Sequence, residues 1–243
     1  MAHLYLLDAT AELTQGSEVS LLGDEARHAA SVGRIGVGEE TLVGNGVGRI
    51  ARARALKVSP KEVVLEVVDV RNDDPVVPEI WLVQALAKGD RDERAIQACT
   101  ELGVDRIIPW ASARSVSVWR GEKARSGVER WRRIATEASK QSLRSRVPVV
   151  QSLATSSEVL NLAKDHHLVV LHPDAPTRLM DLSITDDRPL VMVVGAEGGL
   201  SPAEIEELTR AGAGLYRLGK TVLRTSSAGP AALAVLNGAL GRW

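Results

Sequence analysis

The sequence predicts an α/β protein in two parts: a small β-barrel over residues 1–72 and a parallel sheet with helices on both faces over residues 73–243. Two observations predict this division. Residues 1–70 contain short apolar and β-branched runs separated by turn formers, which is typical of β structure. Beyond residue 80, short apolar runs alternate with stretches of helical spacing, the pattern of strand–helix–strand units.

In the first part, the turn signal Asn45-Gly46 lies between apolar runs and predicts a β-hairpin. Residues 62–70 are rich in valine and predict a further strand. Several short strands in so few residues favour a small barrel. Residues 71–78 contain two prolines and several polar turn formers, so we expect a linker there.

In the second part, the run Leu190–Val194 has no polar alternation and predicts a short strand buried on both faces. Other strands are expected at 80–86, 106–110, 168–172 and near 215–218. Loops follow the last three strands at 172–173, 195–200 and 219–227. Because ligands of open α/β sheets bind beyond the carboxyl ends of the strands, we expect these loops to converge.

Helix starts in the second part are predicted from capping boxes, in which a small polar residue is followed three positions later by glutamate. Ser201 with Glu204 gives the clearest signal, because proline also stands at the first helical position. The other pairs are Asp90 with Glu93 and Ser126 with Glu129. A helix of small residues is expected at 228–240.

Composition excludes several classes of protein. The single cysteine, Cys99, excludes an internal disulfide and favours a reducing compartment. No apolar run approaches the roughly 18 residues of a membrane span, and the first residues show no secretory signal, so we expect a cytoplasmic protein with no membrane partner. The five histidines show no spacing typical of a metal site. No nucleophile-elbow motif is present.

Charge is unevenly distributed along the chain. The formal net charge is −1, but residues 88–146 carry 14 Lys+Arg against 8 Asp+Glu. This excess is typical either of a solvated helix face or of a surface that faces phosphates. With seven aromatic residues and no phenylalanine, extensive stacking on bases is not expected.

Two motifs carry a family resemblance. The segment 195–204, GAEGGLSPAE, followed by 218–233, LGKTVLRTSSAGPAAL, resembles the RsmE family of ribosomal RNA methyltransferases of the SPOUT class. Segments 84–91 and 100–109 are also similar to that family, so the resemblance covers nearly the whole chain. It implies a trefoil-knotted parallel sheet with a PUA-like N-terminal domain, and a homodimer. No metal is expected, because the histidine spacing does not suggest a metal site.

The resemblance also implies an activity: transfer of a methyl group from S-adenosyl-L-methionine to uridine N3 in 16S ribosomal RNA of the small subunit. Arg224 is the first candidate, and Lys220 the second, for the cation that favours the deprotonated uracil. The alternative is that Arg224 only stabilises the knot through hydrogen bonds to carbonyl groups. The residues expected to bind the cofactor are Leu171, His172, Pro173, Gly195, Glu197, Gly198, Gly199, Leu218, Gly219, Leu223, Arg224 and Thr225. Those expected to contact RNA are Arg27, His28, Arg34, Lys88, Arg91, Arg114, Lys140 and Arg144.

The sequence departs from the family pattern at two positions. Ala196 stands where the family usually has proline, and Ser226 stands where it often has an acidic residue. The alternatives are a SPOUT methyltransferase for another RNA site and a non-catalytic RNA-binding assembly factor. A nicotinamide-dependent oxidoreductase is disfavoured because the Gly195–Gly199 loop is not a dinucleotide fingerprint.

Overall fold

The structure is a computed structural model that describes residues 3–243 and separates into two compact units. The first unit takes the chain up to Pro75 together with Ser139–Val147. The second unit takes Val76–Ala138 and Pro148–Trp243.

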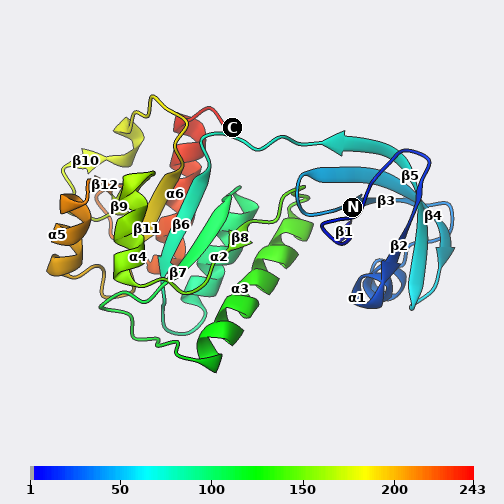
Figure 1. Cartoon of the computed structure of the whole chain (residues 1–243), viewed down its shortest axis with the longest axis horizontal. Coiled ribbons are helices and arrows are strands. Elements are labelled where there is room, and N and C mark those ends of the chain that lie inside the picture. The colour runs from blue at the N-terminus through cyan, green and yellow to red at the C-terminus, as the bar shows by residue number, and fades with distance from the viewer. Residues whose placement is uncertain (1–2) are drawn as a thin grey trace. The chain divides into compact units, whose positions relative to one another are not determined.

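The first unit is built on a five-stranded sheet in the order β1-β3-β4-β5-β2 (Figure 1). The strands are β1 (Leu4–Leu6), β2 (Glu18–Leu22), β3 (Glu40–Gly44), β4 (Arg49–Val58) and β5 (Glu62–Asn72). β1 and β2 occupy the two edges of this order and, within the described residues, do not pair with each other, so the strands do not close into the predicted barrel. The expected small PUA-like β domain therefore has an open sheet.

The predicted hairpin is present: β3 and β4 pair in antiparallel fashion around residues 45–48. The side chain of Asn45 accepts hydrogen bonds from the backbone of Val47 and Arg49, both at 3.0 Å, and so fixes the turn. The β-rich pattern did not predict a short helix, α1 (Gly23–Arg27), which continues into the π-helical turn η1 (His28–Val32).

The second unit contains a seven-stranded, wholly parallel sheet in the order β10-β12-β9-β11-β6-β7-β8. The predicted strands correspond to β6 (Ile80–Ala85), β7 (Arg106–Trp110), β9 (His167–Leu171), β11 (Leu190–Val194) and β12 (Gly214–Arg217). Two short strands, β8 (Val149–Val150) and β10 (Thr177–Arg178), complete the edges. The prediction of a parallel sheet is confirmed.

Helices lie on both faces of this sheet, as expected. They are α2 (Arg91–Glu101), α3 (Glu122–Gln141), α4 (Ser156–Asn161), α5 (Pro202–Arg210) and α6 (Thr225–Ala239), with the 3₁₀ turns η2 (Leu162–Lys164) and η3 (Leu179–Asp181). The capping box of Ser201 and Glu204 is confirmed at the start of α5.

The helix start predicted at Asp90 is confirmed without its capping bond, and the one predicted at Ser126 is wrong. Asp90 is the N-cap of α2 but makes no side-chain capping bond, because its carboxylate pairs with Arg94 at 2.8 Å. The helix expected from Ser126 begins at Glu122, so Ser126 lies within α3 and its hydroxyl donates to the carbonyl of Lys123. At Asp90 the side chain of Arg94 replaces the expected backbone donor. At Ser126 the hydroxyl instead donates to a backbone carbonyl of the preceding helical turn.

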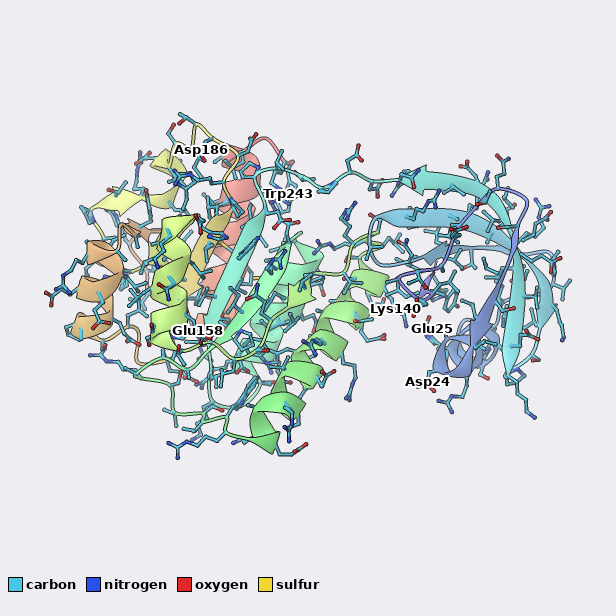
Figure 2. The ribbon with its side chains drawn as sticks, in the orientation of Figure 1. Asp24, Glu25, Lys140, Glu158, Asp186 and Trp243 are labelled. Atoms are coloured by element: carbon cyan, nitrogen blue, oxygen red, sulfur yellow. The ribbon has the colours of Figure 1, made fainter. Side chains whose placement is uncertain are left out.

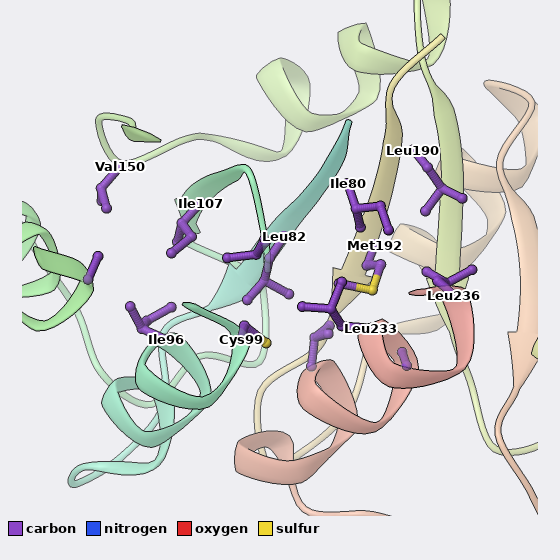
Figure 3. Packing of buried hydrophobic residues seen from close by; sticks show 14 of the residues in the cluster. Ile80, Leu82, Ile96, Cys99, Ile107, Val150, Leu190, Met192, Leu233 and Leu236 are labelled. Carbon is purple, nitrogen blue, oxygen red and sulfur yellow. The ribbon is translucent and has the colours of Figure 1, made fainter. Parts of the chain in front are cut away.

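Alternation along the buried strands separates two cores. Leu190, Met192 and Val194 of β11 belong to one core with α2, α3 and α6, while Val191 and Val193 belong to the other with α4 and α5. Figure 3 shows the first core, in which residues of α6 such as Leu233 and Leu236 pack over Met192 and Ile80. β11 is thus buried on both faces, as its sequence predicted.

A close approach between α2 and α6 depends on Gly229. A Cβ atom at this position would lie 3.3 Å from the sulfur of Cys99 and 3.4 Å from Leu82. Burial raises the pKa of the Cys99 thiol, so the sulfur is held as a neutral packing atom.

We predict that Gly229→Leu lowers the free energy of unfolding by about 1–3 kcal/mol, because the larger side chain overpacks this contact. Gly238→Ala is the matched control in the same helix, where nothing lies within 4 Å of an added Cβ. Urea unfolding measures both variants, and a stability of Gly229→Leu equal to that of the control would contradict the packing argument.

Candidate active site

The three predicted loops lie at one edge of the sheet. Strands β12, β9 and β11 are neighbours and run parallel, so their carboxyl ends meet at the same edge. The loops that follow these strands line a single pocket of about 640 Å³. This volume is within the range of small-molecule and cofactor sites.

Every residue expected to bind the cofactor lines this pocket. Its wall also includes Arg91 and Arg114, which were expected to contact RNA, and Val194, Ala196, Leu200, Thr221, Val222 and Ala228. Lys220 is exposed and is not among the lining residues. The structure therefore favours Arg224 over Lys220 as a residue that meets a ligand.

A tight turn forms the floor of the first loop. The amide of Gly199 donates to the carbonyl of Ala196 at 2.9 Å, and Gly199 has a φ of +67°. A Cβ atom on Gly195 would lie 2.9 Å from the backbone carbon of Gly199, closer than real Cβ atoms come. Gly195 and Gly199 are therefore both required by backbone geometry, the first for close approach and the second for its left-handed conformation.

Glu197, at the tip of this turn, is held by two donors. Its carboxylate accepts from the backbone amide of Lys88 at 2.8 Å and from the guanidinium of Arg91 at 2.7 Å. Partial burial alone would raise the pKa of Glu197, but the backbone donors and Arg91 outweigh it and hold the pKa below its ordinary value. Glu197 is therefore an ionised anchor and a poor proton acceptor.

A second carboxylate secures the turn from the other side. Glu204 is buried and accepts from the backbone amides of Ser201 at 2.8 Å and Ala113 at 2.7 Å. Beside it, the guanidinium of Arg114 donates to the carbonyl of Gly198 at 2.7 Å. The segment after β7 is thereby fixed to the pocket loop.

These contacts distinguish the three arginines that line the pocket. Arg91 is paired with Glu197, and Arg114 is bonded to the carbonyl of Gly198. Across residues 3–243, no hydrogen bond or ion pair engages the guanidinium of Arg224. Its backbone carbonyl accepts from the amides of Ser227 and Ala228. Arg224 is therefore the lining cation whose charge is not already satisfied.

His172 offers no vacant acceptor at Nδ1, which accepts from the backbone amide of Asp174 at 3.2 Å. In its neutral form the ring must then carry its proton on Nε2. The pocket wall accordingly combines one unpaired cation with no group placed as a general base.

The residues expected to contact RNA differ in their accessibility. Arg27 and Arg34 of the first unit are exposed, and Lys88 is exposed in the second. His28 is half-buried with its ring edge-on to Tyr5 at a centroid distance of 5.8 Å, and Arg144 is half-buried. Arg34 adopts the left-handed region with a φ of +51°.

Lys140 does not fit the expected role. Its side chain is 6% exposed and its ammonium lies 2.6 Å from the carboxylate of Glu25 within the first unit (Figure 2). The same carboxylate accepts from the backbone amide of Leu6 at 3.3 Å. Burial and the charge of Glu25 raise the pKa of the neighbouring Tyr5, which the charge of Lys140 partly offsets. In this arrangement a phosphate has no access to Lys140.

The fold and the pocket together define a class of protein: an α/β chain with a pocket of cofactor size in the loops at the carboxyl edge of a parallel sheet, and with a separate small β domain. Comparison with known families makes this class specific. Residues 73–237 match the model of an RNA methyltransferase domain, and residues 21–68 match that of an RNA methyltransferase PUA domain.

Individual relatives agree with the family models. The chain is 36% identical over 248 residues to the ribosomal RNA small subunit methyltransferase E of Mycobacterium bovis, covering 100% of this chain and 94% of the relative. For the enzyme of the same name from Bacillus subtilis the identity is 31%, covering 96% and 95%. The solved structure of that enzyme from Neisseria gonorrhoeae bound to S-adenosyl methionine is 28% identical, covers 98% of each chain and superposes with a TM-score of 0.88.

The chain therefore belongs to the ribosomal RNA small subunit methyltransferase E family of RNA methyltransferases. The resemblance seen in the two sequence motifs is confirmed over the whole chain. Among the residues that the structure describes, none of the helices has the length and apolar character needed to cross a membrane. Within the same residues, no group of three or more potential ligands is arranged to hold a metal ion.

The burial of Lys140 leads to a prediction about stability. Lys140→Met should lower the free energy of unfolding by about 2–3 kcal/mol, because the carboxylate of Glu25 loses its buried partner. The double variant Glu25→Gln with Lys140→Met is the control, and it should recover part of this loss since both charges are removed. Wild-type stability in the single variant, measured by denaturant unfolding, would contradict a structural role.

Proposed function

We propose that this protein transfers the methyl group of S-adenosyl-L-methionine to N3 of a uridine in 16S ribosomal RNA of the small subunit. The observation that carries the proposal is the convergence of three loops on one pocket, in a chain that belongs to this methyltransferase family. The target atom comes from the family resemblance. The same resemblance supports a trefoil knot in the chain and a location in the cytoplasm, where small subunits are found.

The pocket residues fit a methylated sulfonium nucleoside. The wall combines apolar side chains such as Leu171, Leu218 and Leu223 with the exposed backbone of the glycine turn. These groups would hold the adenosine and the amino-acid part of the cofactor by packing and by backbone hydrogen bonds. When bound, S-adenosyl-L-methionine supplies a methyl group that is already activated by its positive sulfur.

The residues of the chain then have two tasks: to orient the uracil and to stabilise loss of its N3 proton. A guanidinium beside the uracil carbonyls favours the deprotonated imide, because opposite charge stabilises the ionised form. Arg224 is the lining residue whose charge is free for this purpose. Since Glu197 is anchored and His172 is bonded at Nδ1, we infer that the N3 proton passes to water.

We further propose that the protein acts as a homodimer, as the resemblance implies. Support comes from apolar side chains that remain exposed beside the pocket, above all Val222 with 78% of its surface accessible. α6 also presents small residues, including Ala231 and Ala234, that are only half-buried. Light scattering of the purified protein distinguishes a dimer from a monomer.

The activity is tested with labelled S-adenosyl-L-methionine and small subunits that lack the modification, in parallel with naked RNA. We expect label in the RNA, and mapping of the methylated nucleotide should show it at N3 of one uridine. Label at another base or atom would support a different methyltransferase specificity. Cofactor binding without any transfer would indicate a non-catalytic assembly factor.

The role of Arg224 gives a kinetic prediction. Arg224→Ala should lower the single-turnover rate by about 10²–10³-fold, the usual effect of removing one group that stabilises developing negative charge. Cofactor affinity should change little. Lys220→Ala is the control from the same loop, and should retain the wild-type rate. Intact binding with a normal rate in Arg224→Ala would exclude the catalytic assignment.

RNA binding by the first unit predicts a change in salt dependence. Arg34→Asn removes the charge while keeping a residue that tolerates the left-handed backbone of this position. If Arg34 contacts one phosphate, the slope of log affinity against log salt should become shallower by about 0.7–0.9. Filter binding between low and moderate salt measures the slope, and an unchanged slope would show that Arg34 is merely solvated.

A further inference from the structure

A chain of hydrogen bonds beneath the pocket begins at Gln84, the next-to-last residue of β6. Its side chain is fully buried, with 0% of its surface accessible. The amide nitrogen donates to the hydroxyl of Thr225 at 2.9 Å, and that hydroxyl donates to the carbonyl of Gly195 at 2.8 Å. One side chain thus connects three segments that are remote in sequence.

The direction of these bonds is fixed by the surroundings of the amide. The nitrogen of Gln84 also donates to the carbonyl of Ala85 at 3.1 Å, so a flipped amide would set two acceptors against each other. Since Thr225 accepts from Gln84, its own proton is available for Gly195. The other end of the amide, Oε1, is buried without a hydrogen-bond partner among the described residues.

A buried acceptor without a partner, here Oε1 of Gln84, is unfavourable. Its presence indicates that the amide nitrogen of Gln84 is needed as a donor. Gly195 begins the first pocket loop and Thr225 ends the second, and both residues line the pocket. Gln84 itself is not a lining residue, although β6 pairs with β11 in the register Gln84 to Val194. Its influence on a ligand must therefore pass through Thr225 and Gly195.

We propose that Gln84 is a positioning residue that sets the spacing of the two pocket loops for the cofactor. The amide orients the Thr225 hydroxyl, and the hydroxyl holds the carbonyl of Gly195 at the end of β11. Without this connection the loops have more freedom, so binding must include the cost of ordering them. The inference rests on the proposed function, because it takes the pocket to be the site of S-adenosyl-L-methionine.

The test replaces Gln84 by methionine, which has similar length and no donor. We expect the dissociation constant for S-adenosyl-L-methionine, measured by calorimetry, to rise about tenfold, as when a binding site loses preorganisation. The single-turnover rate at saturating cofactor should change much less. Thr225→Val should weaken cofactor binding to a similar extent, while Thr225→Ser keeps the hydroxyl and should restore it.

Asn237 provides a matched control. It too is a buried amide in contact with a backbone carbonyl, that of Leu102 at 2.7 Å, and its Oδ1 is also unpartnered in the described chain. It lies at the opposite end of α6 from the pocket. Asn237→Leu should lower the thermal unfolding midpoint without altering the cofactor dissociation constant.

The outcomes separate the inference from the proposed function. If the wild-type protein fails to bind S-adenosyl-L-methionine, the function is wrong. If the wild type binds but Gln84→Met binds equally well, the positioning role is wrong and the function stands. Gln84→Met combined with Thr225→Val should weaken binding little more than either change alone, because both break one chain. Additive losses would overturn the inference as well.

Discussion

The site depends on the position of β11 in the middle of the parallel sheet. Leu190–Val194 pairs with β9 on one side and β6 on the other, and all five residues are buried. Two apolar cores fix the strand in place, so the point at which it ends is fixed as well. At that point Gly195 allows the backbone of the next turn to approach within van der Waals contact. The pocket is therefore a consequence of how the core ends.

Electrostatics then decides what this pocket offers to a ligand. Two carboxylates, Glu197 and Glu204, are engaged by backbone amides and so stabilise the turn. Arg91 and Arg114 are engaged in the same framework. The framework engages its own charged groups, so among the arginines that line the pocket only the guanidinium of Arg224 has no partner in the described part of the chain. A site of this kind is suited to stabilising an anion, and much less to removing a proton.

Local patterns in the sequence predicted the features that local physics determines. The unbroken apolar run of β11, the turn at Asn45 and the capping box of Ser201 each involve residues close together in the chain. Asp90 is the N-cap of α2 as predicted, but its capping bond is absent because a competing partner, Arg94, is equally near. Predictions also failed where the partner was remote in sequence. Lys140 contacts Glu25 across 115 positions, and a periodic sequence pattern cannot indicate such a contact. The predicted domain boundary at residue 72 and the assigned roles of the site residues stay predictions.

The difference between local and remote contacts also explains why the pocket-lining residues were predicted but the buried residue that holds them, Gln84, was not. Residues that line the pocket belong to two compact motifs, so a family resemblance locates them together. Gln84, by contrast, reaches Thr225 across 141 positions. It belongs to a segment that resembles the family, but a single glutamine at the end of an apolar strand does not by itself indicate a role. Only its complete burial and its unpaired oxygen indicate a role. A buried polar group is costly unless its bonds are useful, and here those bonds lead directly to both loops of the site.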